Sequence, residues 1–168
     1  ITGGHATING QEIDLTPPFD RMSVLDAFQT FAGWSREKTL HAAEADEDAF
    51  FLALVDVVEP ELAKRTRATF LTDYPSSQAS LARRSPSDPG VAERFELYVA
   101  GVELCNGFGE LIDPEEQQKR LTRDQEERAR RGLPIYPIDE NFLKALQKGL
   151  PECAGNAIGF DRLVAIAN

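Results

Sequence analysis

Apolar and polar positions in the first part of the chain form a pattern that predicts a hairpin followed by a helix. Residues 6–13 read Ala-Thr-Ile-Asn-Gly-Gln-Glu-Ile, and Asn9-Gly10 is a pair that favours a type I′ turn. Apolar residues recur at helical spacing over 22–31, where Ser23 and Asp26 resemble a capping box. We therefore expect a small antiparallel strand pair and then a short helix.

A second helix is expected to begin near Asp46. Apolar residues recur through the segment that follows and predict its buried side: Phe50, Phe51, Leu54, Val57 and Val58. Pro60 should close or kink this helix, because proline lacks an amide hydrogen and clashes with the preceding turn. Residues 68–73 predict a strand that ends at Tyr74-Pro75, and residues 76–90 are loop-like.

Two further strands are predicted over 94–99 and 102–106, joined by a tight turn at Ala100-Gly101. This turn sets the expected cross-strand pairs: Val99 with Val102, Tyr98 with Glu103, and Glu96 with Cys105. One face of the strand pair would then be polar, with Glu96, Tyr98, Glu103 and Cys105. The opposite face would carry only apolar side chains, which predicts the core on that side and a cleft floor on the polar side.

The two glutamates of this polar face, Glu96 and Glu103, would lie on a diagonal of the strand pair with about 7–8 Å between α-carbons. Converging carboxylates repel each other unless a cation lies between them. Mg²⁺ held by one or two carboxylates and by substrate phosphates would supply that cation. The alternative interpretation is that both side chains are solvated surface charges.

Glu110 is a candidate third acid. It closes the segment Asn106-Gly-Phe-Gly-Glu110, and strict alternation would point its side chain away from Glu103. A bulge at Asn106-Gly107 would bring it back to the same face. A third carboxylate there suits a substrate that carries an ammonium group. The alternative is an exposed glutamate in a turn.

The last third of the chain predicts three helices. The first starts at Asp113-Pro114 and ends before Gly132, and its mixed charges indicate a solvated surface. The second follows Asp139, with inward-facing Phe142, Leu143 and Leu146. Residues 155–159 then lead into a helix that begins near Phe160. Strands followed by helices and a closing strand–helix unit predict an α+β fold, with an antiparallel sheet flanked by helices in a single domain over 1–168.

Small residues at Gly155, Ala157 and Gly159 leave one face of the last strand without bulk, so a flat ligand could lie against it. Arg162 follows on the first turn of the helix, where it could stack on a base or bind a phosphate. The alternative for Arg162 is a salt bridge with a nearby acid.

Composition and charge narrow the classes of function. The chain has 18 Lys and Arg against 28 Asp and Glu, and the net charge of −10 argues against a broad nucleic-acid surface but allows ATP. Neither a membrane span nor a signal peptide is visible, so we expect a cytoplasmic protein without a membrane partner. His5 and His41 are expected at the surface, and Cys105 and Cys153 as small buried residues.

Several separated motifs resemble class II lysyl-tRNA synthetases. They include Arg94-Phe-Glu-Leu-Tyr-Val-Ala-Gly-Val-Glu-Leu-Cys-Asn-Gly-Phe-Gly-Glu-Leu-Ile-Asp113, and Gly155-Asn-Ala-Ile-Gly-Phe-Asp-Arg162, which is similar to motif 3 of that class. Tyr74-Pro-Ser-Ser-Gln-Ala-Ser-Leu-Ala82 and Ala157 are more similar to the tRNA-independent relatives that attach (R)-β-lysine to a lysine of elongation factor P. The resemblance is specific over residues 70–168.

The resemblance implies an ATP-dependent ligase that forms an aminoacyl-adenylate, with roles for individual residues. Glu96 and Glu103 would hold Mg²⁺ on the ATP phosphates, and Arg162 would pack on adenine and reach the γ-phosphate. The catalytic residues would be Arg162 and Glu103. The pocket for a lysine-like amino acid would be lined by Asn106, Phe108, Glu110, Gly155, Ala157 and Gly159.

The family's motifs 1 and 2, which build the dimer interface and bind the α-phosphate, have no counterpart in this sequence. The chain also starts at Ile1 without a methionine and stops in an apolar run at 163–167, so we expect part of a longer, homodimeric protein. On its own this part should be inactive. Elongation factor P is the expected partner and tRNA a less favoured one. The alternatives are a lysyl-tRNA synthetase core and a non-catalytic binding module.

Overall fold

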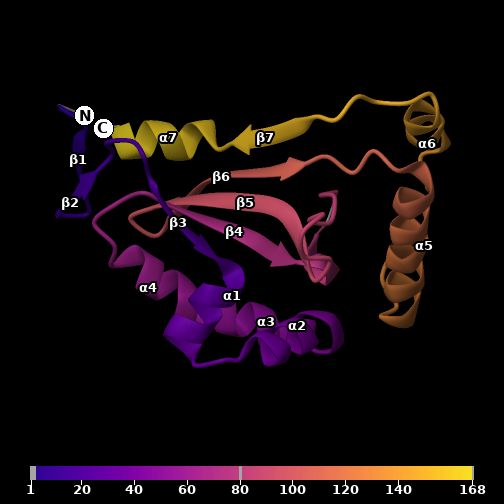
Figure 1. Ribbon diagram of the computed structural model, residues 1–168, viewed down its shortest axis with the longest axis horizontal. Helices are drawn as coiled ribbons and strands as arrows, with labels where there is room; N and C mark the ends of the chain where they lie inside the picture. The colour runs from indigo at the N-terminus through magenta and orange to yellow at the C-terminus, as the bar shows by residue number, and fades with distance from the viewer. Residues whose placement is uncertain (1–2, 80, 168) are drawn as a thin grey trace.

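A five-stranded sheet with the order β3-β4-β5-β6-β7 forms the centre of the computed structural model, which describes residues 3–79 and 81–167 (Figure 1). The strands are β3 (Asp20–Ser23), β4 (Thr69–Pro75), β5 (Val91–Val99), β6 (Val102–Gly109) and β7 (Ala154–Ile158). Only β3 and β4 pair in parallel, and the other three pairs are antiparallel. The predicted α+β class with a mainly antiparallel sheet is confirmed.

The predicted hairpin is also confirmed. Strands β1 (His5–Ile8) and β2 (Gln11–Asp14) pair antiparallel across a two-residue turn. Asn9 and Gly10 have φ angles of 51° and 79°, the positive values that a type I′ turn requires. The hairpin packs on one face of the sheet with α7 (Phe160–Ala167), in a cluster that includes Ile13, Leu97 and Ile166.

A layer of short helices covers part of the other face of the sheet, the one away from the β1–β2 hairpin (Figure 1). The layer contains α1 (Val24–Ala27), the π-helix η1 (Phe28–Ala32), α2 (Arg36–Ala45), α3 (Glu47–Ala53), the π-helix η2 (Leu54–Val58) and α4 (Glu59–Ala63). Phe28, Phe50 and Val58 are completely buried there against Leu71 and Tyr74 of β4.

Several details of this helical layer differ from the prediction. The pattern did not predict α2, because its buried residues are the small Thr39, Ala42 and Ala43. Met22 belongs to β3, and the helix begins after it with Ser23 as the N-cap. The next helix, α3, begins near Asp46 as predicted: Asp46 is its N-cap, and its side chain accepts a hydrogen bond from the Ala49 amide.

The predicted buried face of that helix is partly wrong. Phe50, Leu54 and Val58 are buried, but Phe51 and Val57 are exposed. A π-turn holds more residues than an α-turn, so η2 rotates Val57 out of the expected stripe, whereas Phe51 lies before η2 on the outer side of α3. The helix does not end at Pro60 but continues as α4, because the π segment just before it accommodates a residue without an amide hydrogen.

The β5–β6 hairpin follows the predicted register only near its turn. Ala100 and Gly101 form the turn, and Val99 pairs with Val102 and Tyr98 with Glu103, as predicted. The register then shifts, leaving Leu104 as an extra residue, so that Leu97 pairs with Cys105 and Glu96 with Asn106. The predicted pairing of Glu96 with Cys105 is therefore wrong. Leu104 and Cys105 both lie in the apolar cluster on the far side of the sheet.

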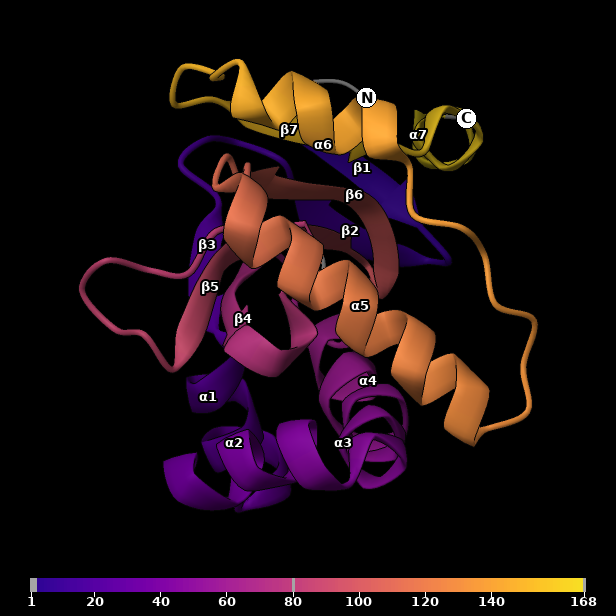
Figure 2. The same ribbon diagram turned by 90° about the vertical axis from the view of Figure 1, so that its right-hand side faces the viewer.

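The C-terminal helices start where the sequence predicts. Asp113 and Asp139 cap α5 (Pro114–Arg130) and α6 (Glu140–Gln147), and each accepts two amide hydrogen bonds. Leu143 and Leu146 of α6 are buried, whereas Phe142 is exposed, contrary to prediction. Helix α5 runs from the neighbourhood of α6 toward the helical layer (Figure 2). Just after the end of α5, Arg131 forms an ion pair with Glu47 of that layer at 3.3 Å. None of the helices in the described ranges is long and apolar enough to cross a membrane.

Strand β7 is the outermost strand of the five-stranded sheet, and in the described residues it pairs only with β6. Large apolar side chains beside it face solvent, since Ile158 is 57% exposed and Phe160 is 73% exposed. This side of the sheet is therefore open, and its small residues are accessible.

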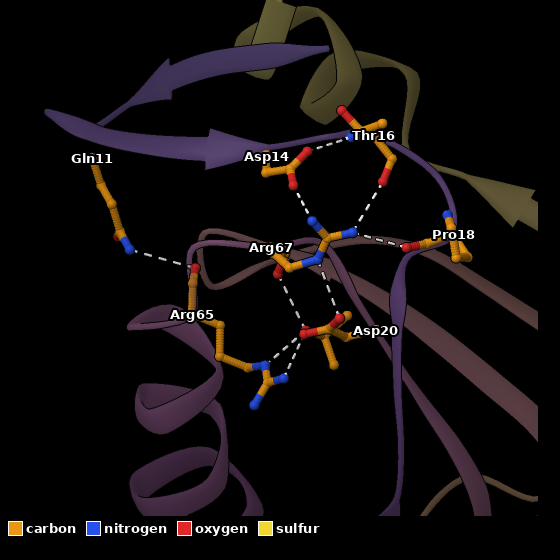
Figure 3. Close-up of polar contacts among 8 residues, drawn as sticks. Gln11, Asp14, Thr16, Pro18, Asp20, Arg65 and Arg67 are labelled. Atoms are coloured by element: carbon orange, nitrogen blue, oxygen red, sulfur yellow. Dashed lines mark hydrogen bonds and ion pairs between the residues drawn. The ribbon is translucent and has the colours of Figure 1, made fainter.

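An arginine-centred cluster attaches the hairpin to the sheet (Figure 3). Arg67, just before β4, forms an ion pair with Asp14 of β2 and another with Asp20 of β3, at 3.2 Å. Its Nη2 also donates to the backbone carbonyls of Thr16 and Pro18, at 3.1 and 2.9 Å. A planar guanidinium has enough donors to join these three segments at once.

We predict that Arg67→Ala lowers the free energy of unfolding of the purified protein by about 2–3 kcal/mol, because it removes one donor from each of two carboxylates and from two backbone carbonyls. Urea denaturation measures this. Lys64→Ala, which removes an exposed pair with Glu61, is the matched control and should cost less than about 1 kcal/mol. Equal losses in the two variants would contradict the role assigned to Arg67.

Candidate active site

The register shift in β6 gathers the polar candidate residues on one face of three adjacent strands. Glu96 of β5 pairs with Asn106 of β6, and Asn106 pairs with Ala157 of β7. One step along, Phe108 pairs with Gly155. Because directly paired residues point to the same side of a sheet and alternate positions share a face, these side chains all face the same way.

The Glu96 carboxylate is the most buried acid of this face, at 6% exposure, and it accepts four hydrogen bonds. Its Oε1 accepts from Arg94 Nη2 at 2.7 Å and from Asn106 Nδ2 at 2.8 Å. Its Oε2 accepts from the hydroxyls of Tyr74 at 2.5 Å and Tyr98 at 2.9 Å. Two donors on each oxygen use the acceptor capacity of a carboxylate, which explains how the charge is held away from water.

Both tyrosines of this network remain donors over the whole physiological range. Burial, followed by the negative charge of Glu96, raises the pKa of the Tyr74 phenol well above its ordinary value. The same two causes raise the pKa of Tyr98, and the charge of Glu59 raises it further. Arg94 also stacks on the Tyr74 ring at 4.4 Å, so its guanidinium is fixed by both an acid and an aromatic face.

This arrangement bears on the metal predicted for Glu96 and Glu103. Within residues 3–79 and 81–167, no cluster of three or more His, Cys, Asp and Glu could hold a metal ion. Glu103 is accessible, with a side chain 36% exposed, and fits a Mg²⁺ ligand that shares the ion with phosphates. Glu96 would have to release one of its four donors to bind a metal, so its predicted role as a ligand stays a prediction.

Glu103 is paired with Arg162 at the first turn of α7. Arg162 Nη1 donates to the backbone carbonyl of Glu103 at 2.6 Å, and it lies 3.4 Å from Oε2 of the Glu103 side chain. The arginine side chain packs over Gly159, where an added Cβ would lie 3.1 Å from Arg162 Cδ. The salt bridge given above as the alternative for Arg162 is thus present. Both side chains are solvent-accessible, so phosphates and a cation could replace this pairing.

Asn106 presents an acceptor to the same face. Its Nδ2 is committed to Glu96, and its Oδ1 is buried without a hydrogen-bond partner in the described part of the chain. A buried carbonyl oxygen without a donor is costly, so this atom is ready to accept a hydrogen bond from a ligand.

Glu110 lies on this face too, although the bulge is at Leu104 and not at Asn106-Gly107 as suggested by the sequence. One extra residue before Asn106 reverses the alternation, so Asn106, Phe108 and Glu110 point together. The Glu110 amide donates to the Cys153 carbonyl at 3.0 Å. Its carboxylate occupies the space above Gly155, because a Cβ built on Gly155 would collide with Glu110 Oε1.

Other candidates lie elsewhere. Cys105 faces the apolar side of the sheet, and Cys153 is exposed, so the prediction of two buried cysteines is half wrong. His5 and His41 are at the surface, as predicted.

Sequence reasoning missed Arg94, Tyr74 and Glu59 as members of the Glu96 network. Alternation along β5 could have revealed Arg94, two residues before Glu96, but nothing local marks Tyr74 or Glu59.

Comparisons with known proteins agree on the family of this chain. The family described as tRNA synthetases class II (D, K and N) matches residues 3–168. The chain is similar to the elongation factor P–(R)-β-lysine ligase of Salmonella gallinarum, with 44% identity over 165 residues, which cover 98% of this chain and 47% of that protein. For the ligase of Salmonella dublin the identity is 52% over 125 residues, covering 74% and 38%. The chain thus spans less than half the length of these relatives.

We predict that Glu96→Ala lowers the free energy of unfolding by about 3–5 kcal/mol, since it leaves the largely buried charge of Arg94 without its acidic partner. Glu103→Ala, which breaks the accessible pair with Arg162, should stay within about 1 kcal/mol of the parent protein. Urea denaturation of both variants measures the difference. If Glu103→Ala were the more destabilising change, the burial argument would be wrong.

Proposed function

The chain belongs to the class II tRNA synthetases (D, K and N), and we propose that it forms the C-terminal part of a catalytic domain that activates a lysine-like amino acid with ATP. The observation that carries this proposal is the placement of polar side chains at both ends of β6, which would serve as an amino-acid side and a phosphate side. Glu110 and Asn106 supply the first, and Glu103 and Arg162 the second. The named ligases among the relatives support (R)-β-lysine as the amino acid and elongation factor P as the acceptor.

The amino-acid side suits a substrate with an ammonium group. The carboxylate of Glu110 would pair with the ammonium, and the unsatisfied Oδ1 of Asn106 would accept a further N–H hydrogen bond. Gly155 gives the Glu110 carboxylate its place over β7, the small Ala157 leaves room beside it, and Phe108 offers an apolar surface there. Ala157 carries one methyl group more than glycine would, and a methyl on a pocket wall alters which substrate shape fits.

The phosphate side suits ATP. Arg162 would offset negative charge on the triphosphate, and Glu103 would hold Mg²⁺ against it. When bound, Mg²⁺ would neutralise charge that develops on the departing pyrophosphate. The substrate carboxylate attacks the α-phosphorus, the bond to the β-phosphate oxygen breaks, and an aminoacyl-adenylate forms with release of pyrophosphate. The residues act by positioning and by charge, and no covalent enzyme intermediate is needed.

The acceptor would be a lysine amine of a protein. The amine attacks the adenylate carbonyl, AMP leaves, and the amine loses a proton, so that an amide forms. A net charge of −10 opposes close contact with the phosphates of a tRNA, which favours a protein acceptor. A lysyl-tRNA synthetase core is the second candidate, and the family match supports it.

We predict that the full-length protein exchanges pyrophosphate into ATP faster with (R)-β-lysine than with α-lysine, and that Glu103→Gln lowers this rate about 100-fold. Glu126→Gln, an exposed change on α5, is the control and should leave the rate unchanged. Faster exchange with α-lysine, together with charging of tRNA, would favour the second candidate. No exchange with either amino acid would favour a non-catalytic module.

We also predict that Gly155→Ala raises KM for the amino acid about tenfold while KM for ATP stays within about twofold, because the new Cβ displaces the Glu110 carboxylate. Pyrophosphate exchange at varied substrate concentrations measures both constants. Glu126→Gln, an exposed change on α5, is again the control and should change neither constant. Equal changes in both KM values would argue against a local effect on Glu110.

A further inference from the structure

A hollow at the end of β4 lies apart from the candidate active site, because the residues that line it are not those of the site described above. Its volume is about 280 Å³. A water molecule takes about 30 Å³ in the liquid, so a group of several atoms fits into the hollow. Four segments that are far apart in the sequence form its walls: α2, residues 75–77 at the start of the 3₁₀ helix η3 (Ser76–Gln78), the loop over 84–90, and α5.

Two arginines from different segments line this hollow, Arg84 of the loop and Arg123 of α5. Within the described ranges, Arg123 forms neither an ion pair nor a side-chain hydrogen bond. Arg84 lies 3.5 Å from Glu116 Oε1, but that oxygen also accepts from Arg120 Nε at 3.0 Å. Glu116 is thus shared between two guanidinium groups, and the positive charge at the hollow is not balanced.

Hydroxyl groups add to the charged donors of the hollow. Ser76 and Ser77 are half-buried in its lining, and neither hydroxyl has a hydrogen-bond partner in the part of the chain that the structure describes. A hydroxyl can donate one hydrogen and a guanidinium can donate several. Leu40 and Pro75 form apolar walls beside these donors. The hollow therefore offers donors from three of its four walls.

An ion pair fixes the shape of the hollow on the side of the loop. Arg36 of α2 pairs with Asp88 at 2.7 Å, and Asp88 also accepts from the Gly90 amide at 3.1 Å. A Cβ added to Gly90 would lie 3.1 Å from Arg36 Nη2, so the loop is packed closely on α2. The Ser76 amide donates to the Gly90 carbonyl at 2.9 Å. These contacts join α2, the loop and η3, so the protein itself holds the walls together.

Glu44 of α2 opposes the two arginines. Among the described residues that line the hollow it is the only acid, and it is exposed and forms no ion pair with Arg84 or Arg123. Two positive charges against one negative charge leave a net attraction for an anion, and Glu44 weakens that attraction. Removing the Glu44 charge should therefore strengthen the binding of an anion, whereas removing an arginine should weaken it.

We propose that this hollow is a binding site for a phosphate group. Guanidinium groups are well suited to phosphate oxygens. A tetrahedral phosphate has enough oxygens to accept from both arginines and both serine hydroxyls, whereas a carboxylate has only two. The phosphate is either a free anion or part of a phosphate monoester, and both share this chemistry. The site does not involve Glu103 or Arg162, so it does not depend on the function proposed above.

Calorimetry with the full-length protein at constant ionic strength measures the binding of three probes: inorganic phosphate, pyrophosphate and AMP. Arg123→Gln should weaken binding about tenfold, because charge-assisted hydrogen bonds to the anion are lost, and Arg84→Gln should do the same. Glu44→Gln should strengthen binding about threefold. Arg162→Gln removes a second place where phosphate can bind, and it should leave the Arg123-dependent binding unchanged.

The matched control is Arg130→Gln, which removes the same charge from the same helix. Arg130 is an exposed partner of Glu127, and Glu127 keeps its ion pair with Arg131 in this variant. Binding of each probe should therefore stay within about twofold of the parent protein. A loss in this control as large as the loss in Arg123→Gln would overturn the proposal, since it would show an effect of net charge only.

Methyl NMR spectroscopy gives the position of the bound anion. The Leu40 methyl signals, assigned with Leu40→Val, should shift as inorganic phosphate or AMP is raised to about 10 mM, and Arg123→Gln should reduce the shift. The methyl signals of Leu143, which is buried under α6, should stay in place. Equal shifts of Leu40 and Leu143 would contradict a local site.

The probes also separate the two sources of phosphate. Arg123-dependent binding of inorganic phosphate or pyrophosphate would support a free anion, and binding of AMP alone would support a monoester. No binding of any probe, binding unchanged by Arg123→Gln, or weaker binding in Glu44→Gln would overturn the proposal. If Arg123-dependent binding is present but the full-length protein activates no amino acid, the proposed function fails while this site stands.

Discussion

The cost of removing the Glu96 carboxylate from water governs the arrangement of this half of the sheet. An ion at that depth is tolerated only when donors replace its hydration, and here the four donors come from β4, β5 and β6. The same contacts that satisfy the charge therefore bind three strands to one another. Tyr74 and Tyr98 also belong to the apolar core beneath the helical layer, so the charge and the core are built from shared side chains.

A single extra residue determines which side chains join Glu96. Without Leu104 as an insertion in β6, strict alternation would direct Asn106, Phe108 and Glu110 into the apolar cluster beneath the hairpin and α7. The bulge instead directs Leu104 and Cys105 toward that cluster. The bulge thus has two effects. Both Leu104 and Cys105 join the apolar core, and the amide of Asn106 and the carboxylate of Glu110 lie on the open face.

How far the sequence could predict this fold depends on where each signal lies. Asn9-Gly10, Asp113-Pro114 and Asp139 act through bonds to their own neighbours, and the elements that they mark are found where they were expected. The bulge at Leu104 has no such local mark, because its cause is the packing of both faces. Helix α2 buries only small residues and so lacks an apolar stripe. Glu59 reaches Tyr98 across 39 positions, a contact that only the tertiary fold creates.

The exposed side of β7 has a consequence for the chain in solution. Within the residues that the structure describes, no strand pairs with the outer edge of β7, which carries Ile158 and is followed by Phe160, and such an edge is a template on which another strand can add. The net charge of −10 opposes such encounters through mutual repulsion. Salt shortens the range of that repulsion to about 8 Å at physiological ionic strength. The tendency of this chain to associate in concentrated samples should therefore depend more on ionic strength than on the free energy of unfolding.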